Sequence, residues 1–145
     1  MEDSKELFQE IIEGNTKLIV PKKSLTEKTP PIKPAFFNPK ARTNRDFSII
    51  AYAAFLKKFD GPKIFLEALS GVGARGLRVA NELKIEKILI NDLNPTALKI
   101  AESSAILNNL KNIEFSEKEA CVFLSEHSRQ GNRGCLLYTS PSPRD

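Results

Sequence analysis

Three short apolar runs, each followed by a helix-like pattern, constrain the fold more than any other feature of this sequence. The runs span 63–69, 87–91 and 113–115, and helical segments follow them to about residues 83, 109 and 128. Strands of this length that alternate with helices are typical of a parallel sheet, because each crossover returns the chain to the same end of the sheet. The pattern predicts an α/β, doubly wound sheet with right-handed crossovers and helices on both faces.

A glycine-containing turn joins the first apolar run to its helix. The sequence Ser70-Gly71-Val72-Gly73 lets the backbone approach a ligand closely, although Gly-x-Gly alone is a weak signal. Asp92 ends the second run, 19 residues after Gly73. In a doubly wound sheet these two positions meet beyond the carboxyl ends of the strands, where a carboxylate accepts hydrogen bonds from ribose hydroxyls. The pair predicts a nucleoside cofactor.

The kind of cofactor stays open on spacing alone. Gly71, Gly73 and Gly76 satisfy the Gly-x-Gly-x-x-Gly spacing of dinucleotide-binding loops. Arg75 and Arg78 suit an anion, which is either the pyrophosphate of NAD or the carboxylate of S-adenosylmethionine. Both arginines are also consistent with exposed positions on a helix. The two cofactors are therefore alternatives at this point.

The segment before the apolar runs is organised differently. Apolar runs at 9–13 and 16–20 flank Gly14-Asn15 and predict a hairpin, with a helix over 4–13 as the alternative. Residues 21–45 show no period and are expected to form an extended arm. Apolar positions then recur at helical spacing and predict an amphipathic helix, with its apolar face at 47, 50, 51, 54 and 55. We expect a hairpin and arm over 1–45, ahead of a domain over 46–134.

The net charge is concentrated in the arm. The chain has a formal charge of +4, and residues 15–45 hold eight basic residues against one acid, together with five prolines. A basic, proline-broken segment beside a charge-balanced domain favours a phosphate-rich partner such as nucleic acid. The alternative is an ordinary solvated surface.

Length and composition exclude several classes of protein. With 145 residues the chain has room for one domain, and no apolar run approaches the roughly 20 residues of a membrane helix. The N-terminus lacks the basic and apolar stretches of a secretory signal. Two cysteines and one histidine are too few for a zinc cage or a disulfide framework, so we expect no metal. We expect a cytoplasmic protein, and no obligate protein partner is evident.

The last eleven residues, 135–145, differ from the rest. The sequence Cys-Leu-Leu-Tyr-Thr-Ser-Pro-Ser-Pro-Arg-Asp resembles the translation of an adapter used in preparing sequencing libraries, and an ordinary flexible tail is the alternative. On the adapter interpretation we expect the native protein to continue past residue 134. The chain would then be an amino-terminal fragment whose sheet is cut after about three strands.

Four motifs in order carry a family resemblance: Pro34-Ala-Phe-Phe-Asn-Pro-Lys, Thr43-Asn-Arg-Asp-Phe, Glu67-Ala-Leu-Ser-Gly-Val-Gly-Ala-Arg-Gly-Leu-Arg and Leu89-Ile-Asn-Asp-Leu. Together they resemble the start of the tRNA (guanine-26-N2) dimethyltransferase family, its archaeal branch in particular, over about residues 14–127. The resemblance implies a class I methyltransferase domain of Rossmann-like fold. It also implies S-adenosyl-L-methionine as the cofactor and tRNA as the substrate.

The resemblance further implies roles for single residues. Arg45 would bind the methionine carboxylate of the cofactor, and Phe36 would pack in the same pocket. Asp92 would bind the ribose hydroxyls, and Glu119-Ala120 falls at the adenine, where the family usually has Asp. The other implied cofactor contacts lie in the glycine turn: Ser70, Gly71, Gly73 and Arg75.

The family's catalytic group is an Asp-Pro-Phe-Gly motif after the fourth strand, and this sequence has no such motif. That carboxylate would orient the exocyclic guanine amine and take up its proton. The resemblance thus implies a parent enzyme that methylates N2 of guanine 26, with this chain as its catalytically incomplete, cofactor-binding half. Two alternatives remain, an NAD-dependent oxidoreductase of the same fold and a non-enzymatic RNA-binding fragment. The basic arm would contact tRNA phosphates through Lys22, Lys23, Lys33, Lys40 and Arg42.

Overall fold

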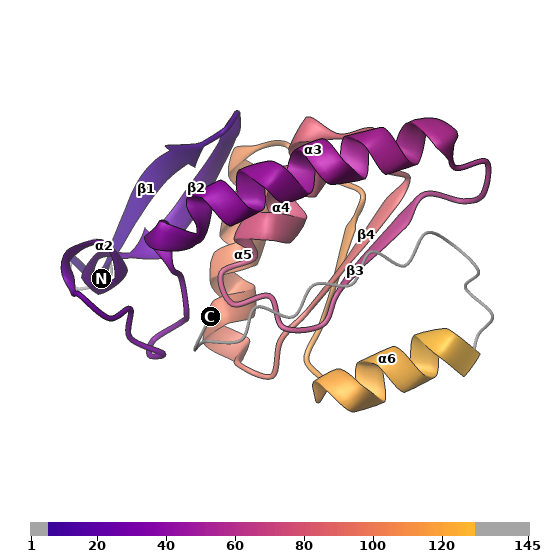
Figure 1. Cartoon of the computed structure of the whole chain (residues 1–145). Coiled ribbons are helices and arrows are strands. Elements are labelled where there is room, and N and C mark those ends of the chain that lie inside the picture. Colours follow the sequence, from indigo (N-terminus) through magenta and orange to yellow (C-terminus); the bar gives the residue numbers. More distant parts are fainter. Residues whose placement is uncertain (1–5, 130–145) are drawn as a thin grey trace.

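The computed structural model describes residues 6–129, and Figure 1 traces them through two sheets and their helices. The expectations for residues 130–134 and for the tail at 135–145 lie outside the described residues. The elements, in chain order, are β1 (Phe8–Glu13), β2 (Thr16–Pro21), α2 (Lys22–Thr26), the short 3-10 helix η1 (Pro39–Ala41), α3 (Arg42–Lys58), β3 (Ile64–Glu67), α4 (Ala74–Glu82), β4 (Lys87–Asn91), α5 (Pro95–Leu107), β5 (Ile113–Ser116) and α6 (Ala120–Arg129).

The larger sheet has the order β3-β4-β5, and all three strands are parallel, as the sequence predicts. Alternate strand residues serve different faces. Phe65, Ile88 and Ile90 belong to the core that contains buried residues of α4 and α5. Leu66 and Leu89 belong to a second cluster with Phe123 of α6. Figure 1 accordingly shows α6 on the opposite side of the sheet from α4 and α5, so the predicted two-faced covering is confirmed.

The smaller sheet is the antiparallel hairpin of β1 and β2, with Glu13 opposite Thr16. Gly14 adopts φ +59° in the two-residue turn, which is the left-handed conformation that such turns require. The hairpin is bonded to α5 because the Ile19 N–H donates to Ser104 Oγ at 2.9 Å. Leu18 and Val20 are fully buried in the core. The hairpin interpretation is confirmed over the helical alternative.

The arm contains more structure than the sequence predicts. Residues 22–26 form the helix α2, and α3 begins already at residue 42, so the expectation of an extended arm up to residue 45 is wrong at both places. Ser24 is fully buried and Leu25 packs on the core, so tertiary contacts fix a helix that local periodicity does not indicate. The Asn38 side chain accepts from the Lys40 N–H at 3.0 Å and thereby starts the turn that leads into α3.

The helix α3 exists as predicted, but its apolar stripe does not face the core. Phe47, Ile50 and Phe55 are 69%, 65% and 45% exposed. The helix instead buries Leu56, and the Tyr52 ring lies 5.6 Å from the Phe65 ring. The spacing therefore identifies the helix correctly, whereas the face that packs is decided by aromatic contacts with β3.

Candidate functional site

The glycine turn and Asp92 meet at the carboxyl ends of β3 and β4, as the sequence predicts. The Gly71 N–H donates to Asp92 Oδ2 at 2.8 Å. Gly71 and Gly73 have φ values of +54° and +80°, which side-chain-bearing residues rarely adopt. In a doubly wound sheet this edge is where ligands bind. The Ser70 N–H donates to the Asn91 carbonyl at 3.1 Å, so the turn is fixed at its start as well.

Asp92 is held in one orientation by two backbone groups. Its Oδ1 accepts from the Asn94 N–H at 2.9 Å, and its Oδ2 accepts from the Gly71 N–H. The side chain is half-buried, and each carboxylate oxygen retains a lone pair for a further donor. The group can therefore accept hydrogen bonds from a pair of neighbouring hydroxyls without losing its place in the turn.

The arm lies against the same edge of the sheet. The Val72 N–H donates to the Phe36 carbonyl at 3.2 Å, and Asn94 Nδ2 donates to the Pro34 carbonyl at 2.8 Å. A Cβ atom on Gly71 would come within 2.5 Å of the Phe36 carbonyl oxygen, so only glycine permits this approach. Phe36, predicted as a cofactor contact, is thus next to the glycine turn and half-buried.

Arg45 is buried at the start of α3 and forms an ion pair with the hairpin. Its Nε and Nη2 donate to the two carboxylate oxygens of Glu13 at 2.6 and 2.8 Å. Nη2 also donates to the Asn38 carbonyl at 3.1 Å, and the guanidinium lies 4.9 Å from the centre of the Phe37 ring. The sequence predicts a ligand for Arg45, and the structure adds a partner that the sequence does not indicate.

Arg75, the other predicted arginine contact, reaches from α4 to α3. Its Nη2 donates to Asn44 Oδ1 at 2.8 Å, and its Nη1 donates to Ser48 Oγ. Arg78, named with Arg75 as suited to an anion, is buried and donates to Glu82 of its own helix and to Asp46 of α3. The bonds to Asn44, Ser48 and Asp46 all join α4 to α3, so both arginines already have structural partners.

Glu67 is a site residue that the sequence analysis missed. It ends β3 directly below the glycine turn, is 1% exposed, and accepts from the Gly76 N–H at 2.9 Å. Burial raises the pKa of Glu67 to about 8, against the opposing effects of Arg75, the Gly76 N–H and Arg45. The signal available in the sequence was an acidic residue near the end of an apolar run, just before the glycine turn.

Asn91 is a second residue that the sequence analysis missed. It is fully buried at the end of β4, and its Nδ2 donates to the carbonyls of Ala68 and Lys118 at 3.0 and 2.8 Å. Its Oδ1 accepts from Ser116 Oγ at 2.6 Å. One amide thus joins the ends of all three strands. An Asn beside Asp92 was visible in the sequence, but the partners were not.

Glu119 and Ala120, predicted at the adenine, lie where α6 begins after β5. Glu119 is exposed and its carbonyl accepts from the Phe123 N–H at 3.0 Å. The preceding Lys118 N–H donates to Asn91 Oδ1 at 3.1 Å, which holds this segment at the carboxyl end of β4. The segment therefore shares the sheet edge that carries Asp92.

Apart from Arg45, the basic residues of the arm are at the surface. All five predicted RNA contacts are exposed. Lys40 Nζ donates to the Lys28 carbonyl at 3.3 Å, and Arg42 lies 4.0 Å from Asp46 on the same helix. Neither bond buries the charge, so these groups stay available to an anionic partner: Lys22, Lys23, Lys33, Lys40 and Arg42.

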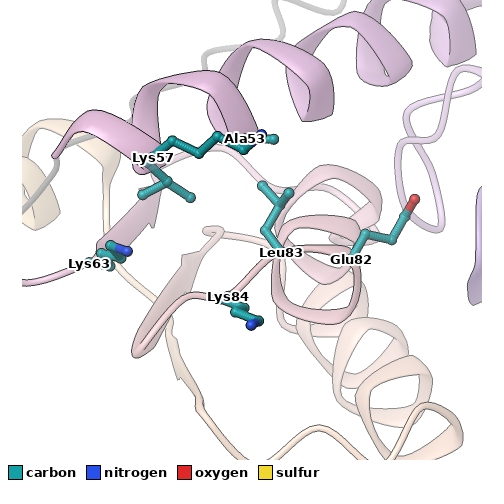
Figure 2. Close-up of a pocket in the computed structure, with 7 residues that line it drawn as sticks. Ala53, Lys57, Lys63, Glu82, Leu83 and Lys84 are labelled. Carbon is teal, nitrogen blue, oxygen red and sulfur yellow. The ribbon is translucent and has the colours of Figure 1, made fainter.

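A hollow of about 220 Å³ lies between α3 and the end of α4, and Figure 2 shows the residues that line it. Lys63 directly precedes β3, and Lys84 lies before β4, so the hollow is at the amino ends of these strands. Ligands of doubly wound sheets bind at the carboxyl ends. We therefore do not assign the cofactor to this hollow, which is lined by Ala53, Leu56, Lys57, Lys63, Glu82, Leu83 and Lys84.

Residues 6–129, the part of the chain that the structure describes, contain neither a metal-binding cluster nor a membrane-spanning helix. Within that range no three His, Cys, Asp or Glu side chains are grouped so as to hold a metal ion. None of the helices in that range has the length and apolar character needed to cross a membrane.

Comparison of the sequence with known proteins identifies a family. A model of the N2,N2-dimethylguanosine tRNA methyltransferases matches residues 14–133. The tRNA (guanine(26)-N(2))-dimethyltransferase of Methanococcus aeolicus is 44% identical over 129 residues, with 84% of this chain and 34% of the relative covered. The protein of the same name from Methanopyrus kandleri is 36% identical, with 83% and 30% covered. The chain spans about a third of the length of these curated relatives.

Solved structures agree with this assignment. The complex of Trm1 from Pyrococcus horikoshii with S-adenosyl-L-methionine matches with a TM-score of 0.68 at 28% identity, over 82% of this chain and 33% of that one. An S-adenosylmethionine-dependent methyltransferase from Agrobacterium tumefaciens matches with a TM-score of 0.67 over 92% of this chain and 40% of that one. At 17% identity the second match supports the fold alone. The predicted methyltransferase fold is confirmed, and the chain belongs to the N2,N2-dimethylguanosine tRNA methyltransferase family.

Proposed function

We propose that this chain is the cofactor-binding part of an enzyme that transfers methyl groups from S-adenosyl-L-methionine to N2 of guanine 26 in tRNA. The observation that carries the proposal is the bond between the Gly71 N–H and Asp92 at the carboxyl edge of the sheet, within the segment that matches the family. This geometry supports a nucleoside ligand because it combines a close-approach backbone turn with an oriented carboxylate.

The residues present fit an adenosyl cofactor. Gly71 has no Cβ to fill the space before the Phe36 carbonyl, and Asp92 keeps free lone pairs for ribose hydroxyls. Glu119 and Ala120 are held at the same edge for the adenine. Arg45 supplies a fixed positive charge for the methionine carboxylate, and the cofactor, when bound, supplies a methyl group on a sulfonium centre.

Methyl transfer also needs groups that the described residues do not provide. The exocyclic amine of guanine is a weak nucleophile because its lone pair is delocalised into the ring, so a carboxylate must orient it and take up its proton. The family's Asp-Pro-Phe-Gly motif does not occur in these 145 residues. We therefore propose that this chain binds the cofactor and does not turn over tRNA by itself.

The exposed cations of the arm support tRNA as the partner. Six of them, Lys28 included, lie along residues 22–42, next to the segment that covers the glycine turn. Contacts of this kind neutralise phosphates and weaken as salt rises. A guanine inside a folded tRNA would have to leave its stack to reach the cofactor.

Isothermal titration calorimetry of the 145-residue chain tests the cofactor assignment. We expect S-adenosylhomocysteine to bind and NAD to bind at least tenfold more weakly, since only the first ligand suits a single-nucleoside site next to a buried arginine. Asp92→Asn should weaken S-adenosylhomocysteine by about tenfold, because a charged acceptor to the ribose is lost. Exposed Asp60→Asn serves as the control. Tighter binding of NAD, or equal effects of the two variants, would contradict the proposal.

A further inference from the structure

Glu13 carries a buried carboxylate, and the residues next to it in the sequence do not explain why an acid is buried there. It ends β1 in the hairpin and is 2% exposed. An ionised carboxylate at that depth is costly unless cations pair with it. The strands β1 and β2 need no acid at this position, since Thr16 opposite it is a neutral residue. The residues that pair with Glu13 therefore indicate its role.

Two arginines from different helices converge on Glu13. Arg45 of α3 makes the bidentate contact at 2.6 and 2.8 Å, and Nη1 of Arg78 of α4 approaches Oε1 at 3.2 Å. Arg78 is in turn held by Glu82 at 2.8 Å and by Asp46 at 2.6 Å. The cluster connects the hairpin, α3 and α4, and its centre is closed to solvent.

The bidentate contact fixes the plane of the Arg45 guanidinium. Side-on pairing uses Nε and Nη2, and Nη2 also donates to the Asn38 carbonyl. Among the described residues Nη1 makes no hydrogen bond that would compete for it. The guanidinium also reaches the carboxyl end of β3 electrostatically, since it opposes the rise that burial causes in the pKa of Glu67. Arg45 is held against Phe37 and Asn38, which directly follow Phe36, the residue whose carbonyl accepts from the Val72 N–H of the glycine turn, and its Nη1 is unoccupied.

We propose that Glu13 is a positioning residue of the cofactor site: it holds Arg45 so that the guanidinium presents its unoccupied Nη1 to the carboxylate of the cofactor's methionine part. The inference rests on the proposed function and extends it, because it makes the hairpin part of the cofactor site. Without Glu13 the long arginine side chain regains its rotamers, and orienting it costs binding energy.

Two ligands separate positioning from simple structural support. S-adenosylhomocysteine carries the methionine-derived carboxylate, whereas 5′-methylthioadenosine keeps the adenosine and the thioether but has no carboxylate. We expect Glu13→Gln to weaken S-adenosylhomocysteine by about tenfold and to change 5′-methylthioadenosine by less than about twofold, measured by calorimetry on the 145-residue chain. A merely structural role would weaken both ligands together.

Glu82→Gln is the matched control. It removes a charge from the same cluster but from a residue that bonds Arg78 and Thr16, not Arg45. We expect it to leave the ratio of the two affinities unchanged. Three results would each overturn the inference. The ratio of the two affinities could be the same in Glu13→Gln as in the wild type, or S-adenosylhomocysteine could bind more tightly to Glu13→Gln. The third such result is an equal change of this ratio in Glu82→Gln. If the wild-type chain bound neither ligand, the proposed function itself would fail and the inference with it.

Discussion

The strand–helix unit over 63–129 and the segment over 6–42 differ in what holds them in place. The unit is stabilised by parallel pairing and by two apolar clusters that follow the alternation of strand residues. The earlier segment is stabilised by long-range bonds, such as Ile19 to Ser104 and Val72 to Phe36. Both nevertheless supply residues to one edge of the sheet. The edge of the sheet thus combines a locally encoded framework with a segment placed only by tertiary contacts.

Leu18→Ala should produce the largest effect on stability. Leu18 is fully buried in the hairpin, and truncation of a core leucine typically costs about 2–5 kcal/mol of unfolding free energy. Ile12, 64% exposed on the paired strand, offers the control Ile12→Ala with a cost below about 0.5 kcal/mol. Urea denaturation followed by circular dichroism measures both. Equally small losses of unfolding free energy in the two variants would mean that the hairpin adds little to the stability of the fold. That result would contradict the difference described between the two regions.

Glu67→Gln should remove a pH dependence that originates in the strand–helix unit. Because the folded pKa is raised from 4.5 to about 8, the protonated carboxyl stabilises the fold fully below about pH 4.5, and this contribution is lost as pH rises through 8. The loss is about 1.4 kcal/mol for each pH unit between the two values. Gln keeps an acceptor for the Gly76 N–H.

The check is denaturation of wild type and Glu67→Gln at pH 5, 7 and 9. We expect the variant to gain relative stability at the highest pH. The control Glu114→Gln concerns a surface carboxyl paired with Lys87 and should track the wild type. If the unfolding free energies of wild type and Glu67→Gln differed by the same amount at pH 5, 7 and 9, Glu67 would be ionised throughout that range.

Replacing Lys22 and Lys23 by Gln should weaken tRNA binding moderately. Both lysines are exposed on α2, and each lost phosphate contact reduces the slope of log affinity against log salt by about 1. We expect a loss of about threefold to tenfold at low salt, measured by filter binding across a salt series. Lys99 and Lys111, exposed on and just after α5, provide the matched double control. Equal losses in both double variants would mean that the arm has no special role in RNA contact.

Local sequence signals predicted much of the strand–helix unit. β4 spans Lys87–Asn91 as predicted, and the helix after it ends at Leu107, close to the predicted end near residue 109. The turn and Asp92 were placed together by the general topology of such sheets. These features depend on neighbours within a few residues or on a rule common to the whole fold class.

The rest depended on partners far away in the chain. Arg45 and Glu13 are 32 positions apart, and no periodicity connects them. The exposed stripe of α3 follows helical spacing as well as a buried one would, so spacing alone gave the wrong face. Glu67 could be recognised in the sequence as an acid, but its burial depends on the packing of α4 against the end of β3. The meeting of the glycine turn and Asp92 could therefore be predicted from the sequence, whereas the contacts that bring the arm to the turn could not.

Hydrogen exchange measured by mass spectrometry, with and without S-adenosylhomocysteine, tests most directly whether arm and turn form one site. We expect slower exchange in the ligand complex both at 70–73 and at 35–38, since the Phe36 carbonyl and the Val72 N–H are already bonded at 3.2 Å. Slowing confined to 70–73, with the arm exchanging as in the free chain, would contradict it.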